Sequence, residues 1–486
     1  MAKGASAHLT GSRRAGALSG GVMTLLVGAC SLAPPLQVPE VSTGGGYKEL
    51  GPWAQAQPSD RLPRDSWWAL YQTPEIDDLE QRLIAGNPTL ASALANYAQA
   101  RAVSDQARAG LFPTVGLNAS VSRARDSVNA LPISDLTPRY QDNNVLEGSI
   151  SYEIDLWGQI RNQVVAGTAN AEAAAADLEN ARLSLLAQLV EDYVQLRSLD
   201  REAVILDDTV KAYDRGQTIT RQRHDAGIAP GLDVAQAETQ LHAARSQAAQ
   251  ILAQRAFMEH AIAALLGISA STFAIQPALV DIKLPHIPTG VPTTLLERRP
   301  DIAGAQRRMI AANANIGVAR AAYFPSLTLG AQGGFQSTRF SNWLTLPSTV
   351  WAIGPNALLT VFDGGLRRAQ VAQARAEFDA SAANYRSTVV AAFQQVEDSL
   401  ASLNYYNDAA QQENSAVDAA QRSLDLSMAL YKQGAADYLT VVTSQTALLQ
   451  AQLQALNLDT LQLQASVNLV RALGGGWEDT QRVAVR

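Results

Sequence analysis

The sequence predicts a mainly α-helical protein with a four-strand β contribution, built as a strand–strand–long-helix repeat that occurs twice. Three observations support this fold class. Short motifs recur in the same order about 210 residues apart, as in residues 107–113 and 319–325. Long stretches contain little or no glycine and proline, which is typical of long helices. Four short segments alternate between apolar and small polar residues, which is typical of half-exposed strands.

The composition excludes several classes of protein. Of 486 residues, 6% are aromatic and 17% are charged, whereas alanine and glutamine are abundant. Small side chains suit closely packed helices better than one large globular core. The formal net charge is -7 and no lysine- or arginine-rich run occurs, so no nucleic-acid partner is expected.

The predicted organisation has six parts. They are a signal peptide, an N-terminal segment, a first repeat, a linker, a second repeat and a C-terminal tail, at residues 1–29, 30–73, 74–267, 268–298, 299–474 and 475–486. Prolines break any helix in the N-terminal segment and in the linker, so both are predicted to be extended. The pair Trp67 and Trp68, near the end of the N-terminal segment, could pin that end, and ordinary packing is the favoured interpretation.

The signal peptide ends at Cys30, the single cysteine of the chain. Basic residues precede an apolar stretch over 15–29 that is too short for a transmembrane helix. Small residues directly before Cys30 resemble a bacterial lipobox, so Cys30 is predicted to carry a covalent lipid. The alternative is a chance cysteine after an ordinary signal peptide. By the same resemblance, Ser31 in place of aspartate favours sorting to the outer membrane.

The first repeat begins with a helix and two strands. Apolar residues at helical spacing predict a helix over 74–109. Alternating segments at 115–121 and 150–156 predict antiparallel strands joined by a polar loop over 126–143.

The second repeat follows the same plan. A helix is predicted over 299–321 and strands over 327–335 and 351–361, joined by a loop over 337–349. Pro355 inside the fourth strand predicts a bulge or local kink, because proline cannot donate a ladder hydrogen bond.

Each repeat ends in a long helical hairpin. The predicted helices cover 159–226 and 232–266 in the first repeat, and 366–433 and 438–473 in the second. A helix over 366–433 would be about 100 Å long, more than three times the ~30 Å hydrocarbon layer of a membrane. Apolar residues in the last helix step by four and three, which is typical of a coiled-coil seam.

Four strands cannot close a barrel, and an open sheet edge cannot lie in lipid. No run of 18 apolar residues follows residue 30, so a membrane-spanning form would need strands from further copies. Two chains would give eight strands and a filled interior, and three would give twelve and a lumen. The apolar strand face would meet lipid and the polar face water. The alternative is a soluble sandwich edge with one solvated face.

Motifs for catalysis are absent from the sequence. No phosphate-binding loop, zinc-binding pair or nucleophile elbow occurs. His242 and His260 share a helix face but would lie about 27 Å apart, too far to share a metal ion. Residues 298–301 are interpreted as a helix start. The chain is therefore expected not to be an enzyme and to need no metal or other cofactor.

Several longer stretches resemble a known family. They are CSLAP at 30–34, LLERRPDI at 295–302, AANANIGVARAAYFPS at 311–326 and ALGGGW at 472–477. The chain resembles the outer-membrane factors of tripartite efflux pumps, of the TolC/OprM type and in particular the NodT-type lipoprotein branch. The resemblance covers essentially all of residues 30–480.

The resemblance implies a homotrimer in which a 12-stranded outer-membrane β-barrel continues into a periplasmic α-helical barrel. Such a channel would passively carry drugs and other small toxic compounds from the periplasm to the exterior. Its partners would be outer-membrane lipid, a periplasmic adaptor protein and an inner-membrane pump of the resistance-nodulation-division (RND) class. Two alternatives are the outer-membrane duct of a type I protein-secretion system and a lipid-anchored coiled-coil scaffold.

The resemblance also implies a gate at the periplasmic helical tip. In the family an aspartate of the first turn bonds a tyrosine before the second turn, and these positions match Asp233 and Tyr431. The residues that would line the pore match Leu439, Thr440 and Thr443. Relatives carry aspartate at the position of Thr443, and some carry arginine at the position of Ala436, which counts against a cation-selecting carboxylate ring here. Asp437 could supply charge nearby. The alternative for Asp233 is a helix N-cap after Gly231.

Overall fold

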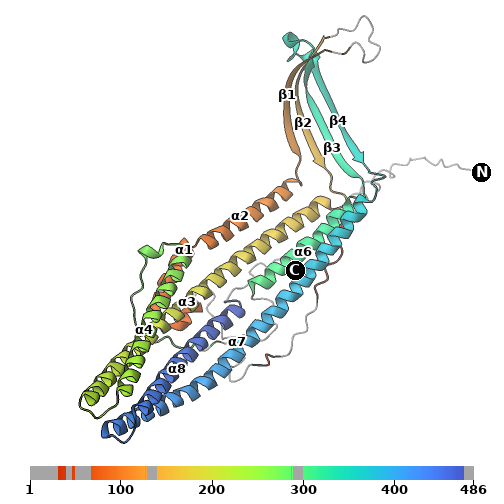
Figure 1. The fold of residues 1–486 in the computed structure, drawn as a ribbon. Coiled ribbons are helices and arrows are strands. Elements are labelled where there is room, and N and C mark those ends of the chain that lie inside the picture. The colour runs from red at the N-terminus through yellow and green to blue at the C-terminus, as the bar shows by residue number, and fades with distance from the viewer. Residues whose placement is uncertain are drawn as a thin grey trace, which may run out of the picture. The chain divides into compact units, whose positions relative to one another are not determined.

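The structure is a computed structural model that describes residues 31–39, 46–49, 67–125, 127, 140–285, 287 and 299–475. Residue contacts divide the chain into two compact units, which are described separately (Figure 1). The sheet unit comprises residues 1–38, 100–171 and 307–382, and the helical unit comprises residues 39–99, 172–306 and 383–486.

The helices lie close to the predicted spans. They are α1 (Pro74–Gly86), α2 (Pro88–Ala109), α3 (Gln159–Asp225), α4 (Gly231–Leu265), α6 (Pro300–Ala321), α7 (Leu366–Gln433) and α8 (Tyr438–Ala472). Within the described residues, no helix combines the length and the apolar character that a membrane crossing requires.

The single helix expected over 74–109 is two helices, because the chain breaks at Asn87. The Asn87 backbone is extended, and its side chain accepts a hydrogen bond from the Leu90 amide at 2.9 Å. Its amide group also donates to the Leu265 carbonyl oxygen at 2.7 Å. Asparagine before Pro88 favours this break, because proline disfavours a helical residue before it and suits the first helical position.

The sheet unit contains one antiparallel sheet in the order β1-β2-β3-β4 (Figure 1). The strands are β1 (Thr114–Arg125), β2 (Tyr140–Glu153), β3 (Ser326–Ser337) and β4 (Thr349–Leu358). The β2–β3 pair joins the two repeats, and β1 and β4 form the edges. β2 starts inside the loop predicted over 126–143, and β4 ends before residue 361, so both predicted boundaries were wrong by a few residues.

Pro355 does not produce the expected bulge. Its neighbours pair with β3 in an unbroken register, with Pro355 itself opposite Leu329. β4 is an edge strand of this sheet, where proline is tolerated because no described strand pairs with the outer side of β4.

The register places apolar residues on one face of the sheet and polar or small residues on the other. On the first face Val115, Ile150, Ala331 and Ile353 form one row across the four strands. On the second face the adjacent row is Gly116, Ser149, Gln332 and Ala352. Val115 and Ile353 are exposed by 75% and 68%, so the part of the chain that the structure describes leaves the apolar face uncovered.

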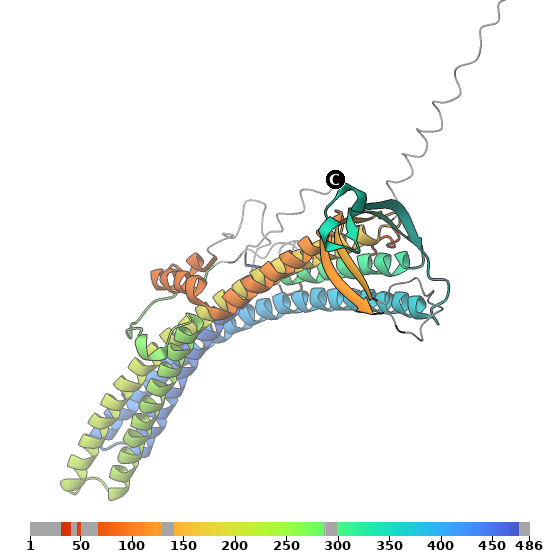
Figure 2. The ribbon, with the colours of Figure 1, turned by 90° about the horizontal axis from the view of Figure 1, so that it is seen from above.

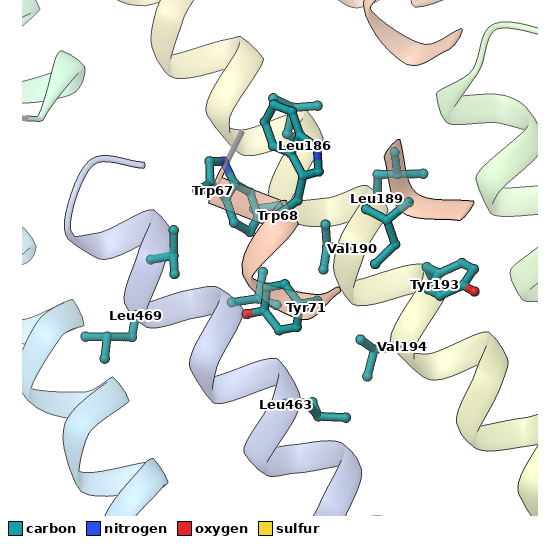
Figure 3. Packing of buried hydrophobic residues seen from close by; sticks show 14 of the residues in the cluster. Trp67, Trp68, Tyr71, Leu186, Leu189, Val190, Tyr193, Val194, Leu463 and Leu469 are labelled. Atoms are coloured by element: carbon teal, nitrogen blue, oxygen red, sulfur yellow. The ribbon is translucent and has the colours of Figure 1, made fainter. Parts of the chain in front are cut away.

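The helical unit contains the main apolar core (Figure 3). A 3₁₀ helix over Trp67–Tyr71 inserts its aromatic side chains between α3 and α8. The Tyr71 side chain is 1% exposed, and its hydroxyl shares a 2.8 Å hydrogen bond with Ser466 Oγ. Trp67 and Trp68 are 2% and 6% exposed in the same core, which confirms that they serve packing. Part of the α8 seam also faces this interior, because Leu463, Val467 and Val470 are buried in the same cluster.

A buried ionic network ties α1, α3 and α4 together in the helical unit. Arg197, 1% exposed, lies 2.6 Å from a Glu75 oxygen and 2.8 Å from an Asp200 oxygen. Arg255 donates to the other Asp200 oxygen at 2.7 Å and to Glu259 at 2.8 Å. Buried charges need such partners, since an unpaired charge in the interior is strongly unfavourable.

The first described residues are held within the sheet unit. Ser31 Oγ donates to Asn162 Oδ1 at 3.0 Å, and Arg320 donates to the Leu32 carbonyl oxygen at 3.1 Å. Asn313 donates to the Pro34 carbonyl oxygen at 2.9 Å. Residues 31–34 therefore bridge α3 of the first repeat and α6 of the second. Cys30, where the lipid is predicted, lies outside the described residues.

Candidate functional site

Two helical hairpins, α3–α4 and α7–α8, lie side by side in the helical unit (Figure 2). Both turns close in the same way. The Ile228 amide donates to the Arg223 carbonyl at 2.7 Å, and the Ala435 amide donates to the Leu430 carbonyl at 2.9 Å. Gly227 in the first turn has a positive φ, as glycine at a helix C-terminus commonly does. The duplicated sequence thus builds two equivalent hairpin ends.

A small apolar cluster joins the two ends. It contains Ala237 of α4, Tyr431 of α7, and Tyr438 and Val441 of α8. The rings of Tyr431 and Tyr438 are 5.2 Å apart between centroids and tilted by 60°. Both tyrosines are buried, with 3% and 1% exposure. The predicted gate residue Tyr431 therefore lies in the packing between the hairpins.

The Tyr431 hydroxyl is buried and has no hydrogen-bond partner among the described residues. The bond to Asp233 that the resemblance implies is therefore not formed within this chain. Asp233 does lie near the cluster, because its negative charge adds to the effect of burial in raising the pKa of the Tyr438 hydroxyl to about 12. The two residues belong to one site, but packing of the Tyr431 ring accounts for its position, rather than a hydrogen bond.

Asp233 occupies the first turn of α4 and is half-exposed. The N-cap of this helix is Pro230, whose carbonyl accepts from the Asp233 amide at 3.1 Å, so the alternative of Asp233 as N-cap was wrong. Burial raises the pKa of the Asp233 carboxyl, repulsion from Asp437 adds to this, and Arg223 opposes it. A carboxylate in a first helical turn is also favoured by the helix dipole.

Leu439, Thr440 and Thr443 lie exposed on the first two turns of α8. Leu439 keeps 54% of its side chain accessible, although it is a large apolar residue. Thr443 Oγ1 donates to the Leu439 carbonyl at 2.9 Å, since the two positions are one helical turn apart. The opposite face of α8 is buried against the cluster. This helix therefore presents the three predicted pore residues together.

Asp437 is the N-cap of α8, a role that the sequence analysis did not assign. Its Oδ1 accepts from the Thr440 amide at 3.0 Å and from the Thr440 hydroxyl at 2.6 Å. These hydrogen bonds lower the pKa of the Asp437 carboxyl. Asp437, rather than Thr443, thus places a negative charge at this hairpin end. The available sequence signal was an aspartate directly before the predicted helix start, because aspartate is a preferred N-cap residue.

Arg223 is a further residue of this site that was not predicted from the sequence. It lies in the last turn of α3, and its guanidinium carbon is 4.8 Å from the centroid of the Tyr431 ring. Its Nη1 donates to the Lys432 carbonyl oxygen at 3.2 Å. No local signal could reveal these contacts, because Lys432 is 209 positions away in the chain.

Metal-ligating side chains do not gather anywhere in the described part of the chain in groups that could hold an ion. One polar cavity of about 310 Å³ lies between α7 and α8, and it is lined by residues such as Gln395, Asp398, Gln464, Asn468 and Arg471. It contains none of the predicted site residues.

Comparisons with known proteins agree with one another. The family model described as "Outer membrane efflux protein" matches residues 79–268 and 291–475. The toluene efflux pump outer membrane protein TtgC of Pseudomonas putida is 31% identical over 465 residues, covering 95% of each chain. The pyoverdine export outer membrane protein OpmQ of Pseudomonas putida is 32% identical over 464 residues, covering 94% of this chain and 96% of OpmQ.

Solved structures show the same fold. The outer-membrane channel OprN superposes with a TM-score of 0.86 at 27% identity, covering 93% of this chain and 100% of OprN. The open state of the Neisseria gonorrhoeae MtrE outer membrane channel has a TM-score of 0.78 at 25% identity, with coverage of 93% and 100%. The expected fold class is thereby confirmed.

Proposed function

We propose, from the premise that this chain belongs to the outer membrane efflux protein family, that it forms a passive exit duct with two further copies of itself. Membership makes it an outer-membrane efflux channel that extends into the periplasm. The proposal concerns how the duct is closed, what it carries and what it binds.

The two-faced sheet carries the proposal. Among the described residues, both edges of the sheet, β1 and β4, lack a strand partner, and the apolar face is exposed. Pairing the edges of three copies would satisfy the open backbone groups and give twelve strands, enough for a lumen, whereas eight strands leave an interior filled by side chains. The row of Gly116, Ser149 and Gln332 would then line water, and the row of Val115 and Ile150 would meet lipid.

Small organic compounds are the proposed cargo. The relatives named for toluene and for pyoverdine export differ greatly in cargo, which supports a wide and unselective duct. The names of the relatives also favour an efflux pump over a protein-secretion system, so a periplasmic adaptor and an RND-type inner-membrane pump are the proposed partners. A coiled-coil scaffold would not need a sheet with one polar and one apolar face.

Planar-bilayer recording with the purified full-length protein tests the duct. We expect discrete conductance steps from an assembly of three chains. Efflux should be tested in a bacterial strain that lacks its own outer-membrane efflux channel but retains the adaptor and pump. Restored resistance to small organic toxicants is the expected result. A well-folded monomer with no conductance and no restored resistance would contradict the proposal.

The gate is proposed at the hairpin ends. Leu439, Thr440 and Thr443 share an exposed face of α8, which supports their placement at the pore, and Asp233 and Tyr431 lie at the joint between the hairpins. Replacing Leu439 by serine should increase ion leak through the resting channel. An unchanged leak would remove Leu439 from the gate.

The lipid at Cys30 is proposed as a second anchor of the assembled protein. The contacts of Ser31, Leu32 and Pro34 hold the following residues against α3 and α6, which supports a fixed attachment point. Mass spectrometry of the Cys30→Ser protein should show loss of the acyl groups, with trimers and efflux retained. Loss of efflux from correctly sorted trimers would contradict a merely anchoring role.

A further inference from the structure

We propose that Arg223 holds the two hairpin ends of each chain together and thereby sets how tightly the resting gate is closed. This inference rests on the proposed gate at the hairpin ends. Arg223 belongs to the first hairpin and positions the second. The group that it holds is the Tyr431 ring, not the Tyr431 hydroxyl.

Two contacts carry the proposal. The Arg223 guanidinium carbon lies 4.8 Å from the centroid of the Tyr431 ring, within the range of an attractive cation–π interaction. Its Nη1 donates at 3.2 Å to the carbonyl oxygen of Lys432. Lys432 lies in the last turn of α7, where carbonyl groups lack partners within the helix and the helix dipole is negative. Arg223, at the C-terminus of α3, therefore donates a hydrogen bond to a carbonyl group at the C-terminus of α7 that lacks a partner within its own helix.

The contact between Arg223 and Tyr431 leaves one polar group of each side chain without a hydrogen bond. Arg223 Nε and the Tyr431 hydroxyl are both buried without a partner among the described residues. A buried polar atom without a partner is unfavourable, and exposure to water would satisfy it. Separation of the hairpins would therefore break the cation–π interaction and the Lys432 hydrogen bond, but water could then bond Arg223 Nε and the Tyr431 hydroxyl. A joint of this kind holds the ends together without making separation prohibitive.

The charges around Arg223 support the placement. The Asp233 carboxylate of the adjacent α4 is attracted by Arg223 and repelled by Asp437 of the second hairpin. Without Arg223, the repulsion of Asp233 by Asp437 would lose the positive charge that opposes it. The guanidinium thus offsets a repulsion that would favour separation of the hairpins.

Arg221 provides a matched control. It lies on the same helix two positions earlier, and its guanidinium pairs with Glu238 of α4 inside its own hairpin. Both side chains of this pair are about half-exposed, at 55% and 41%. Removing its charge changes the net charge of the hairpin end by the same amount as removing that of Arg223. Because this pair lies inside the first hairpin, its removal leaves the Arg223 contacts to the second hairpin in place.

The test compares the full-length wild-type channel with Arg223→Gln, Arg223→Lys and Arg221→Gln in planar bilayers. We expect Arg223→Gln to raise the resting leak by about fivefold to tenfold, because the cation–π interaction and the charge are both lost. Arg223→Lys should lie in between, because an ammonium keeps the charge but not the planar stacking. Arg221→Gln should match the wild type. Equal leak in Arg223→Gln and the wild type, or an equal increase in Arg221→Gln, would overturn the proposal.

A double-mutant cycle identifies the partner. Tyr431→Leu should raise the leak, and Arg223→Gln should raise it less in this background than in the wild type, because the shared cation–π contact is already lost. Fully additive effects would overturn the pairing. If Arg223→Gln does not assemble, the cycle is run with Arg223→Lys, and trimer yield is measured for every variant. If the wild type conducts and the effects are additive, only the proposed Arg223 contact is rejected. If neither the wild type nor any variant conducts, the channel proposal is rejected as well.

Discussion

Gly227 and Gly434 occupy equivalent places in the two helical hairpins, with φ values of 72° and 78°. Each follows the last turn of a long helix, and in each the next residue donates back to a carbonyl five positions earlier. The two sites belong to different repeats, so the same left-handed turn has been kept in both halves of the duplicated chain. The first prediction follows from this shared conformation.

Gly434→Ala should destabilise the second hairpin by about 1 kcal/mol, because a side chain disfavours positive φ. An added Cβ would meet no atom within 4 Å, so backbone strain alone would cause the loss. Denaturant unfolding followed by circular dichroism would measure it. Gly354→Ala is the control, since that glycine also has open space around its Cβ but no positive φ. Equal effects of the two substitutions would refute strain at residue 434.

Arg197→Met should be among the most damaging single substitutions in the helical unit. It would leave the buried Asp200 carboxylate without its 2.8 Å partner, and breaking a buried pair costs about 3–5 kcal/mol. Urea unfolding of the detergent-solubilised protein gives the free-energy difference. Arg201→Met is the matched control, because its 3.5 Å pair with Asp459 is half-exposed and such pairs contribute about 0–1 kcal/mol. Similar losses in both variants would contradict the importance of burial.

Glu80 should make stability fall as pH rises toward neutrality. Burial raises the pKa of its carboxyl from 4.5 to about 7. Below pH 4.5 both the folded and the unfolded state are protonated, so the group has little effect. Between pH 4.5 and 7 the unfolded state loses its proton first, so the group costs stability progressively over that window, and the cost is complete above it.

Glu80→Gln should therefore be neutral near pH 4 and stabilising near pH 8. Unfolding free energies measured across this range test it, with the exposed Glu377→Gln as control. A constant difference between Glu80→Gln and the wild type at all pH values would show that the carboxyl does not titrate within the window.

Tyr431→Phe should leave the resting leak of the channel unchanged. The hydroxyl it removes is buried without a partner, whereas the ring and its 4.8 Å contact with Arg223 would remain. Tyr431→Leu should raise the leak because the aromatic face is lost. Ion-current recording of both variants separates the two groups. A large leak from Tyr431→Phe would show that the hydroxyl bonds a carboxylate, such as that of Asp233, in the assembled channel.

The sequence by itself determined the elements of this protein. Its long helices and alternating strands depend on local spacing, on proline and on glycine, and the break at Asn87 was available in the same local signal. It also carried the duplication that places Gly227 and Gly434 in equivalent turns. The family followed from contiguous stretches such as residues 311–326, whose resemblance needs no folding to be seen.

Only the tertiary structure decided which groups meet. Pro355 fits its strand because β4 lies at the edge of the sheet, and that position depends on the pairing of distant segments. Arg223 donates to the Lys432 carbonyl across 209 positions of chain, and Arg197 donates to Glu75 across 122 positions. Such partners are brought together by the packing of whole helices against one another, so no spacing rule along a single helix can reveal them.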